Sequence, residues 1–320
     1  MKTIKKIILT LGAASAAQAL CACAVWAASS EAGTSAAQFL KLGAGSKAGA
    51  QAEAYTAAAD DVYSAYYNPA GLTRLPASEF AAQHVNYFQD INYEFMAFAL
   101  PFDKQDGAAR QALGLSIYNL SATGLETRTQ DTLLAQGLFD ASESAYAFSY
   151  AYRIRKNFGA GATLKYIREK IDTEAAGAVA MDAGLYYKPL EDKPLDIGFA
   201  VRNFGSKLNF GGGKDSLPLG GVLGFAYTFI PGLKADIDLA QYRDASLIVA
   251  GGAEYSRDFK NEMSAAVRAG YTTHNKDVGS GLKGFAAGAG LRYSHLSFDF
   301  AWVPFGDLGD TFRYTISARF

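Results

Sequence analysis

Beyond Leu75 the chain alternates large apolar side chains with small or charged ones, segment after segment, and this alternation constrains the fold more than any other feature. Between residues 143 and 155 the large side chains share one face: Tyr146, Phe148, Tyr150 and Tyr152. The small side chains share the other face: Ala145, Ala147, Ser149 and Ala151. A period of two is the signature of a β-strand. The sequence therefore predicts an all-β chain.

The alternating segments can be counted. We expect fourteen strands at residues 78–88, 91–102, 110–121, 143–155, 158–169, 177–188, 194–204, 217–229, 232–243, 245–256, 261–273, 283–294, 295–303 and 311–320. Short connections at 103–109, 156–157, 189–193, 230–231, 257–260 and 294–295 alternate with long ones at 122–142, 205–216 and 274–282. Outer-membrane barrels have even strand numbers, short periplasmic turns and longer extracellular loops.

A soluble β-sandwich also alternates, but its outer face accepts long charged residues freely. Here the second face mixes Gly and Ala with isolated charges, as a narrow lumen would. With 19 Tyr and 21 Phe the chain is too aromatic for disorder, and no later apolar run approaches the ~20 residues of a spanning helix. The sequence thus predicts a 14-stranded antiparallel transmembrane β-barrel of the bacterial outer membrane, at residues 77–320, with membrane lipid as a partner.

Aromatic residues favour the ends of the expected strands, as at Tyr87, Tyr186, Tyr187, Tyr293 and Trp302. A membrane interface enriches Tyr and Trp, so we expect these side chains at the two lipid boundaries. The last expected strand ends on an aromatic residue, Phe320.

Charged residues recur on the small-residue face, which we assign to the lumen. The acidic members are Asp182, Asp196, Asp236, Asp238, Glu254 and Asp299. The basic members are Lys165, Arg202, Lys234, Arg268, Arg292, Arg313 and Arg319. The near balance of sign favours a network of ion pairs that fills the barrel over a strongly ion-selective pore.

The first 28 residues read as a secretory signal peptide. Three lysines precede an apolar run at 7–26, and small residues follow at Ala27 and Ala28. A rival processing site exists, because Leu20-Cys21-Ala22-Cys23 resembles a lipobox that would leave Cys23 lipid-modified. Both cysteines lie in this leader, so no disulfide framework is expected in the mature chain.

Residues 29–76 do not alternate, and we expect them to form a small N-terminal plug. Gly, Ala and Ser dominate up to Ala59, so this stretch cannot build a core of its own. Asp60 or Asp61 is expected to N-cap a helix over 62–67. Pro69 biases Asn68 away from the α region, and Gly71 allows a turn, so residues 68–72 are expected to act as a hinge.

This stretch also carries a resemblance to a known family. The shared elements are Asp60-Asp61, Tyr66-Tyr67 and Asn68-Pro69-Ala70-Gly71-Leu72, preceded by Glu53-Ala54-Tyr55-Thr56-Ala57. Together they resemble the N-terminal signature of the PorV/PorQ outer-membrane proteins, a family similar to the FadL transporters. The resemblance implies a 14-stranded barrel with an N-terminal hatch. It also implies a role in either the uptake of hydrophobic compounds or type IX protein secretion.

Two functions therefore remain open, and neither is enzymatic. We favour a channel for small hydrophobic compounds, with a secretion component that binds cargo through its extracellular loops as the alternative. Loop 122–142 is apolar enough to hold a lipid or a protein partner. Asp60-Asp61 has no nucleophile or His beside it in sequence, and no His or Cys has metal-ligand spacing, so no catalytic site or cofactor is expected. A formal charge of −1 gives no indication of nucleic-acid binding.

Overall fold

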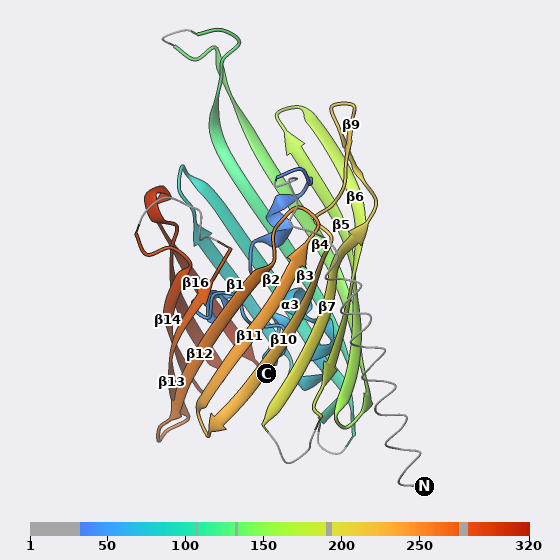
Figure 1. The fold of residues 1–320 in the computed structure, drawn as a ribbon, viewed down its shortest axis with the longest axis vertical. Coiled ribbons are helices and arrows are strands. Elements are labelled where there is room, and N and C mark those ends of the chain that lie inside the picture. The colour runs from blue at the N-terminus through green and yellow to red at the C-terminus, as the bar shows by residue number, and fades with distance from the viewer. Residues whose placement is uncertain (1–32, 106–107, 132–133, 190–193, 275–280) are drawn as a thin grey trace.

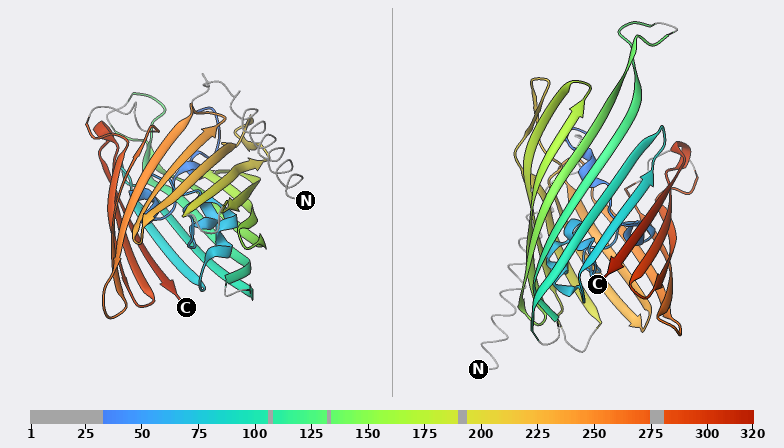
Figure 2. Two further views of the ribbon diagram at one scale, coloured as in Figure 1. Left: turned by 60° about the horizontal axis from the view of Figure 1, so that its bottom comes forward. Right: turned by 180° about the vertical axis from the view of Figure 1, so that it is seen from behind.

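The computed structural model describes residues 33–105, 108–131, 134–189, 194–274 and 281–320, and these form a closed barrel of fourteen antiparallel strands (Figure 1). The first strand pairs with the second and also with the last, which closes the barrel (Figure 2). This confirms the predicted fold class and strand number. The predicted signal peptide and Cys23 lie outside the described residues.

The strands follow the chain around the barrel in order. They are β1 Glu79–Asn86, β2 Ile91–Gln105, β3 Ala108–Thr127, β4 Gly137–Arg155, β5 Phe158–Ile171, β6 Glu174–Tyr187, β7 Leu195–Gly205, β10 Gly220–Ile230, β11 Leu233–Tyr242, β12 Ile248–Asp258, β13 Met263–Thr272, β14 Phe285–Tyr293, β15 Leu296–Pro304 and β16 Asp310–Arg319. A small hairpin of β8 Leu208–Phe210 and β9 Gly213–Asp215 lies in the connection between β7 and β10. A 3₁₀ turn, η3 Gly306–Leu308, joins β15 to β16.

The prediction of a long loop at 122–142 is wrong, because most of these residues belong to strands β3 and β4. β3 and β4 remain paired beyond Ala122, up to the pair Thr127 and Gly137, and the hairpin rises above the rest of the barrel (Figure 1). A register shift between Ala122 and Leu125, with Gly124 at φ 70°, interrupts the alternation on which the prediction depended.

The two faces of the wall differ as the sequence predicts. Tyr146, Phe148 and Leu115 are about half exposed on the outside, whereas Ala145 and Ala151 are fully buried on the inside. A closed barrel leaves no unpaired sheet edge, and an apolar outer face suits hydrocarbon. The architecture is therefore that of a transmembrane barrel of the bacterial outer membrane. None of the helices in the described residues is long and apolar enough to span a membrane.

The interface prediction is wrong for two of the aromatic residues. The Tyr186 hydroxyl donates to Asp196 inside the barrel at 2.8 Å, and the Arg74 guanidinium lies 4.4 Å from the Tyr186 ring centroid. Tyr87 lines an interior cavity and contacts Phe305 edge-on. Both residues occupy inward-facing positions of the alternation, two residues after the buried Gly184 and Val85, and a place at a strand end alone does not reveal which way an aromatic side chain points.

The two ends of the barrel differ in their connections. Tight turns at 156–157, 231–232 and 294–295 define one end, which we call the turn end. Longer connections at 128–136, 206–219 and 243–247 define the loop end. The general rule for such barrels puts turns in the periplasm and loops outside, so the loop end is extracellular.

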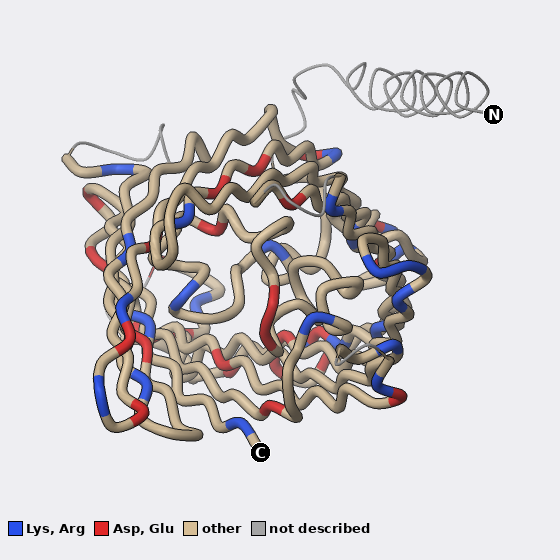
Figure 3. The backbone as a smooth tube through the Cα atoms, turned by 90° about the horizontal axis from the view of Figure 1, so that it is seen from below, with Lys and Arg blue, Asp and Glu red and all other residues tan. Residues whose placement is uncertain are grey.

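Residues 33–78, the N-terminal segment, lie inside the barrel (Figure 3). The segment contains four short elements: η1 Gln38–Lys41, α2 Ser46–Ala50, α3 Ser64–Tyr67 and η2 Pro69–Arg74. Their apolar side chains form one buried cluster with inward residues of the wall, including Phe39, Tyr66, Leu72, Phe95 and Tyr118. The hydrophobic core of this protein therefore lies inside the barrel, where the N-terminal segment packs against the inner wall.

Candidate functional site in the barrel lumen

Asn68, Pro69 and Gly71 begin a 3₁₀ helix instead of forming a simple turn. Asn68 is extended at φ −161°, as expected, and its Oδ1 accepts a hydrogen bond from the Ala70 amide at 3.2 Å. Its Nδ2 donates to the carbonyl of Leu185 in β6 at 2.9 Å, which ties η2 to the wall. Gly71 is not left-handed. A Cβ at Gly71 would lie 2.6 Å from the Ala59 carbonyl oxygen, so close packing requires this glycine.

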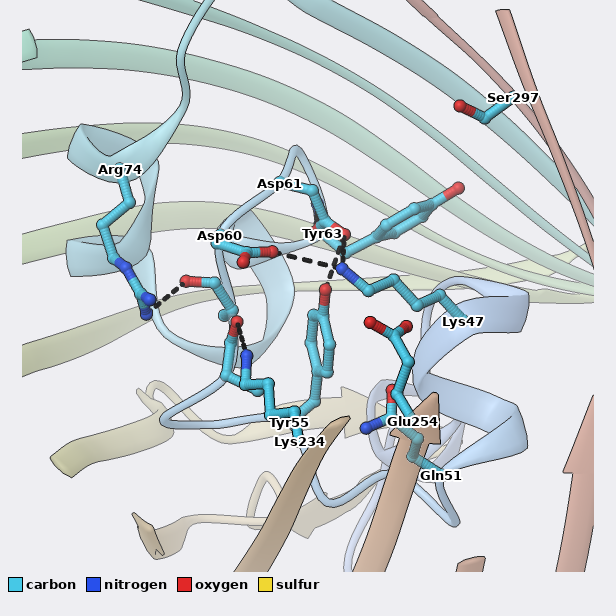
Figure 4. A network of polar contacts seen from close by, with 12 residues as sticks. Lys47, Gln51, Tyr55, Asp60, Asp61, Tyr63, Arg74, Lys234, Glu254 and Ser297 are labelled. Carbon is cyan, nitrogen blue, oxygen red and sulfur yellow. Dashed lines mark hydrogen bonds and ion pairs between the residues drawn. The ribbon is translucent and has the colours of Figure 1, made fainter. Parts of the chain in front are cut away.

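The main contact of Asp60 and Asp61 is an ion pair with a lysine, and neither residue caps a helix as the sequence predicts. The expected helix over 62–67 is reduced to α3 Ser64–Tyr67, which has no side-chain cap, although Asp61 Oδ1 accepts from the Tyr63 amide at 3.1 Å. The Lys47 ammonium of α2 lies 3.2 Å from Asp60 Oδ1 and 3.4 Å from Asp61 Oδ2 (Figure 4). The Tyr55 hydroxyl donates to Asp61 at 2.6 Å. We call Lys47, Asp60 and Asp61 the lysine latch.

Two members of the lysine latch, Lys47 and Asp60, are charged at neutral pH. Burial by itself would lower the pKa of Lys47, but Asp60 and Asp61 raise it above its usual range. Burial would likewise raise the pKa of Asp60, yet Lys47, Lys234 and Arg74 together hold it below its usual range. The Lys47 ammonium and the Asp60 carboxylate therefore stabilise each other's charged forms.

Several of the predicted lumen charges contact the N-terminal segment directly. Arg202 donates to the Tyr67 carbonyl at 2.6 Å and to Thr56 Oγ1 at 3.1 Å. Asp238 accepts from the Tyr55 and Thr56 amides at 3.1 and 2.9 Å. Further contacts join Arg313 to Glu53 at 2.9 Å, Asp196 to Arg74 at 3.0 Å, Lys234 to the Ala58 carbonyl at 3.3 Å and Asp236 to Gln51 at 2.5 Å.

The remaining predicted charges pair along the wall. Lys165 lies 2.8 Å from Asp182, and Arg268 bridges Glu254 and Asp299 at 2.5 and 2.6 Å. Arg319 pairs with Glu79 at 2.9 Å, and Arg292 donates to Ser297 at 3.2 Å. Phe320 lies outside the lumen: its amide donates to the Ser78 carbonyl at 3.0 Å, and its ring stacks on Phe98.

Inward glycines let the segment approach the wall at two places that sequence reasoning missed. The first glycine seat consists of Gly161, Gly184, Gly198 and Gly224 in β5, β6, β7 and β10. A Cβ at Gly161 would lie 2.5 Å from the Pro69 carbonyl carbon, and one at Gly198 would lie 2.4 Å from the Thr56 oxygen. Glycines at small-face positions of the strand pattern are the signal that could have indicated this seat.

The second glycine seat consists of Gly252, Gly270 and Gly288 in β12, β13 and β14. Here the C-terminal end of α2 and the turn at 51–54 lie directly on the wall. A Cβ at Gly270 would lie 2.4 Å from the Gln51 carbonyl carbon, and one at Gly288 would lie 2.6 Å from Ala50 Cβ. Side chains at these positions would push α2 into the lumen.

Two cavities flank α2, one toward each end of the barrel. The outer cavity, of about 120 Å³, lies toward the loop end and is lined by Gly49, Ala52 and Glu53 together with wall residues such as Phe285 and Phe305. The inner cavity, of about 370 Å³, lies toward the turn end and is lined by Lys47, Asp60 and Asp61 together with wall residues such as Arg268 and Arg319. Residues 46–54 thus form a partition between the two cavities, and we call them the partition.

No family model matches this chain, and no curated protein matches it in sequence. Solved structures do match its fold. The monoaromatic hydrocarbon channel CymD superposes with a TM-score of 0.62 at 12% identity, covering 87% of this chain and 98% of that one. The Ralstonia pickettii toluene transporter TbuX gives 0.58 at 13% identity, covering 87% and 98%. A Pseudomonas aeruginosa FadL homologue gives 0.56 at 14% identity, covering 85% and 97%. The chain therefore has the fold of the FadL-like channels and transporters.

Proposed function

We propose that this protein is an outer-membrane channel for small hydrophobic compounds, and that its N-terminal segment is the plug of that channel. The observation that carries the proposal is the arrangement of two cavities on opposite sides of one thin partition. A compound that enters from the loop end would reach the outer cavity first. Its path to the inner cavity, and so to the periplasm, is blocked by residues 46–54. The fold shared with CymD and TbuX supports the same function.

The contacts of the partition would allow it to shift without disruption of the barrel. It lies on glycines, so no side chain of the second glycine seat interlocks with it. Its ionic contacts are Lys47 with Asp60 and Asp61, and Glu53 with Arg313. Water can replace such contacts when the partition shifts, whereas interlocked apolar side chains would have to unpack. Transport through this protein would therefore require only local displacement of residues 46–54.

Deleting residues 43–67 tests the proposal. The deletion removes the partition and α3 but no barrel strand, so the protein should remain a heat-modifiable barrel in detergent. In proteoliposomes it should raise ion conductance and toluene influx above the intact protein. A folded deletion variant with unchanged conductance and influx would contradict the plug, and intact protein that passes toluene no faster than empty liposomes would contradict the channel.

The secretion alternative rests on the resemblance of residues 53–72 to the PorV/PorQ signature. None of the three solved structures described above is named as a secretion component. Crosslinking in intact envelopes followed by affinity purification separates the two functions. Recovery of secretion subunits or cargo with the barrel would replace the channel proposal.

A further inference from the structure

We propose that the outer surface of the barrel binds one lipid with a phosphorylated headgroup, of the lipid A type. The site consists of an apolar groove in the lipid-facing wall and of two cations, Arg168 and Lys170, on the loop-end side of that groove. This inference goes beyond the channel and does not depend on it. It comes from the shape of the groove, from the lack of ion-pair partners for the two cations and from their height in the barrel.

The groove has a volume of about 590 Å³ and lies on the tall side of the wall, in front in the right view of Figure 2. Strand register places its large side chains in two rows that run across the strands. The row nearer the turn end is Phe80, Phe98, Leu115, Phe148 and Leu164, and the row nearer the loop end is Met96, Ile117, Tyr146, Tyr166 and Val179. We call this the lipid-side groove.

The floor of the lipid-side groove is backbone. The residues between the two rows have buried side chains that point into the barrel: Ala97, Ser116, Ala147 and Lys165. Neighbouring strands lie about 4.8 Å apart, so a groove that reaches from β1 to β6 is roughly 24 Å long. A long, narrow, apolar groove in this position suits an extended acyl chain.

Arg168 and Lys170, the basic pair, are the next outward positions of β5 beyond Tyr166, in the direction of the loop end. Both are exposed, and neither forms an ion pair within the described part of the chain. Small residues lie opposite them in the adjacent strands: Ser144 and Gly177 opposite Arg168, and Ser142 and Ala175 opposite Lys170. A phosphate can therefore reach both cations from the lipid side, and a guanidinium binds phosphate through two parallel hydrogen bonds.

Tyr166 connects the lipid-side groove to the basic pair. Its ring lines the groove and is about half exposed. Its hydroxyl extends toward the row of Arg168, because a Cβ at Gly177 would lie 3.2 Å from the hydroxyl oxygen. A Tyr side chain in this position buries its ring among acyl chains and offers its hydroxyl to a headgroup.

The charges on this part of the outer face favour an anionic headgroup at β5. In the row that contains Arg168, Asn119 and Ser144 separate it from Glu94 on β2, and Glu94 Oε1 lies 3.8 Å from His84 Nδ1. Asp172 and Glu174 lie at the β5–β6 turn, beyond the basic pair toward solvent. The two cations therefore lie between these acidic residues and the lipid-side groove.

The basic pair also lies at the height where a headgroup is expected. Arg168 is ten residues beyond Phe158, the first residue of β5 at the turn end. At ~3.3 Å per residue and a strand tilt of about 40°, Arg168 lies roughly 25 Å above the turn. The apolar band of such barrels is about 25 Å tall. The basic pair therefore lies at the extracellular edge of the band, with the lipid-side groove directly below it.

Binding to the full chain in detergent micelles tests the inference, with native mass spectrometry as the readout. The probes are lipid A with both phosphates and the same lipid without phosphates. The phosphorylated lipid should bind at least about tenfold more tightly, which corresponds to ~1.4 kcal/mol. Arg168→Gln with Lys170→Gln should reduce its affinity about tenfold and leave the affinity of the dephosphorylated lipid unchanged.

Two further variants separate the headgroup from the acyl chain. Phe148→Ala with Leu164→Ala removes two side chains of the lipid-side groove and should weaken both lipids by a similar factor. Lys207→Gln with Lys214→Gln is the matched control, because it removes two exposed cations from the connection between β7 and β10, and it should change neither affinity.

Equal affinity of the two lipids for the intact protein would overturn the inference, and this comparison needs no variant to fold. An equal loss in the Lys207 and Lys214 variant would also overturn it, because surface charge in general would then explain the binding. Displacement of the lipid by an equal concentration of inorganic phosphate would show that the groove contributes nothing. Phosphorylated lipid bound through the basic pair, without toluene influx in proteoliposomes, would uphold this site and contradict the channel.

Discussion

The two halves of the barrel hold the N-terminal segment by different means. On the half formed by β2 to β6, aromatic rings interlock: Tyr63, Tyr66, Phe95 and Tyr118 pack with centroids 5.0–6.5 Å apart. Helix η2 contacts β3, β4, β5 and β6 on this same half. Glycines lie under the segment on both halves, but on the half formed by β11 to β16 no aromatic ring of the segment interlocks with the wall among the described ring contacts. There the partition packs only small side chains, Ala50 and Ala52, on the wall, and the Glu53–Arg313 ion pair and a cavity on each side accompany them. We call these the anchored half and the open half.

This difference indicates which part of the N-terminal segment is held less firmly. Aromatic burial contributes a large, non-directional free energy that is lost only when the rings separate. The ion pairs of the partition border the two cavities, so water that enters when the partition shifts can solvate the separated charges. The anchored half therefore fixes the N-terminal segment in the barrel, and under the proposed function the partition on the open half is the part that would move.

The largest effect should follow replacement of residues 46–53 by a Gly/Ser segment of equal length. This change removes α2, Lys47 and Glu53 but keeps the chain length and the anchored half. We expect conductance in planar bilayers to rise severalfold, with no change in heat-modifiability. Wild-type conductance from this variant would show that residues other than the partition close the path, and the distinction between the two halves would then fail.

On the anchored half, Tyr66→Ala should loosen the whole plug. Tyr66 is 4% exposed, packs on Phe95 and Tyr118, and donates to the Leu40 carbonyl at 3.2 Å. Removal of a large buried aromatic side chain costs about 3–5 kcal/mol. Trypsin should then cleave at Lys41, Lys47 or Arg74 much faster than in the intact protein. Tyr66→Phe is the control and should cost only the hydrogen bond, about 1 kcal/mol. Equal protease resistance of Tyr66→Ala and the intact protein would mean that the rings do not anchor the plug.

A smaller effect is expected from overpacking the second glycine seat. Gly270→Val places a side chain where Gln51 and Ala52 now touch the wall, and overpacking costs about 1–3 kcal/mol. Because the partition can yield and the wall cannot, we expect a modest rise in conductance with unchanged thermal stability of the barrel. Gly221→Val is the matched control, since nothing lies within 4 Å of a Cβ there. If Gly270→Val lowers barrel stability without raising conductance, the partition is fixed more rigidly than the open half allows.

The sequence predicts the fold well because alternation is a local signal. Large residues face lipid in nearly every strand, as Tyr146 and Phe148 do in β4. Each strand can therefore be identified from its own sequence, without reference to its neighbours. The predictions fail where the alternation is broken locally, as at Gly124. They also fail where the alternation gives the face of a side chain but not the residues that surround it. Tyr186 is such a case, because only the folded chain brings Arg74 and Asp196 to it.

The interior is predictable only in part, because its contacts join distant residues. The strand pattern places Arg202, Asp238 and Arg313 on the small-residue face, but it does not give their partners in the N-terminal segment. Lys47 pairs with Asp60 and Asp61 because the N-terminal segment folds back on itself between them. No periodic pattern in the sequence predicts this reversal. Glycine in a strand usually indicates a weakened strand or a bulge, so its close contact with the N-terminal segment can be recognised only in the folded structure.

The smallest expected effect concerns pH and the lysine latch. The pKa of Asp60 is lowered in the folded protein, so its contribution to closure is complete above its unfolded pKa of about 3.9 and is lost only as pH falls through the lower folded value. The pKa of Lys47 is raised, so its contribution is complete below about 10.4 and is lost only as pH rises through the higher folded value. The Lys47–Asp60 pair should therefore contribute no pH dependence to the conductance between about pH 5 and about pH 9.

Lys47→Gln should make the same measurement depend on pH, and this contrast tests whether the latch closes the open half. Without the ammonium, two adjacent carboxylates repel, and the pKa of one of them rises. Conductance should then exceed the wild-type value at neutral pH and fall toward it as the medium is acidified and one carboxylate binds a proton. A variant with wild-type conductance at every pH would show that the glycine seat and the Glu53–Arg313 pair hold the partition without Lys47. The lysine latch would then not be needed to close the open half.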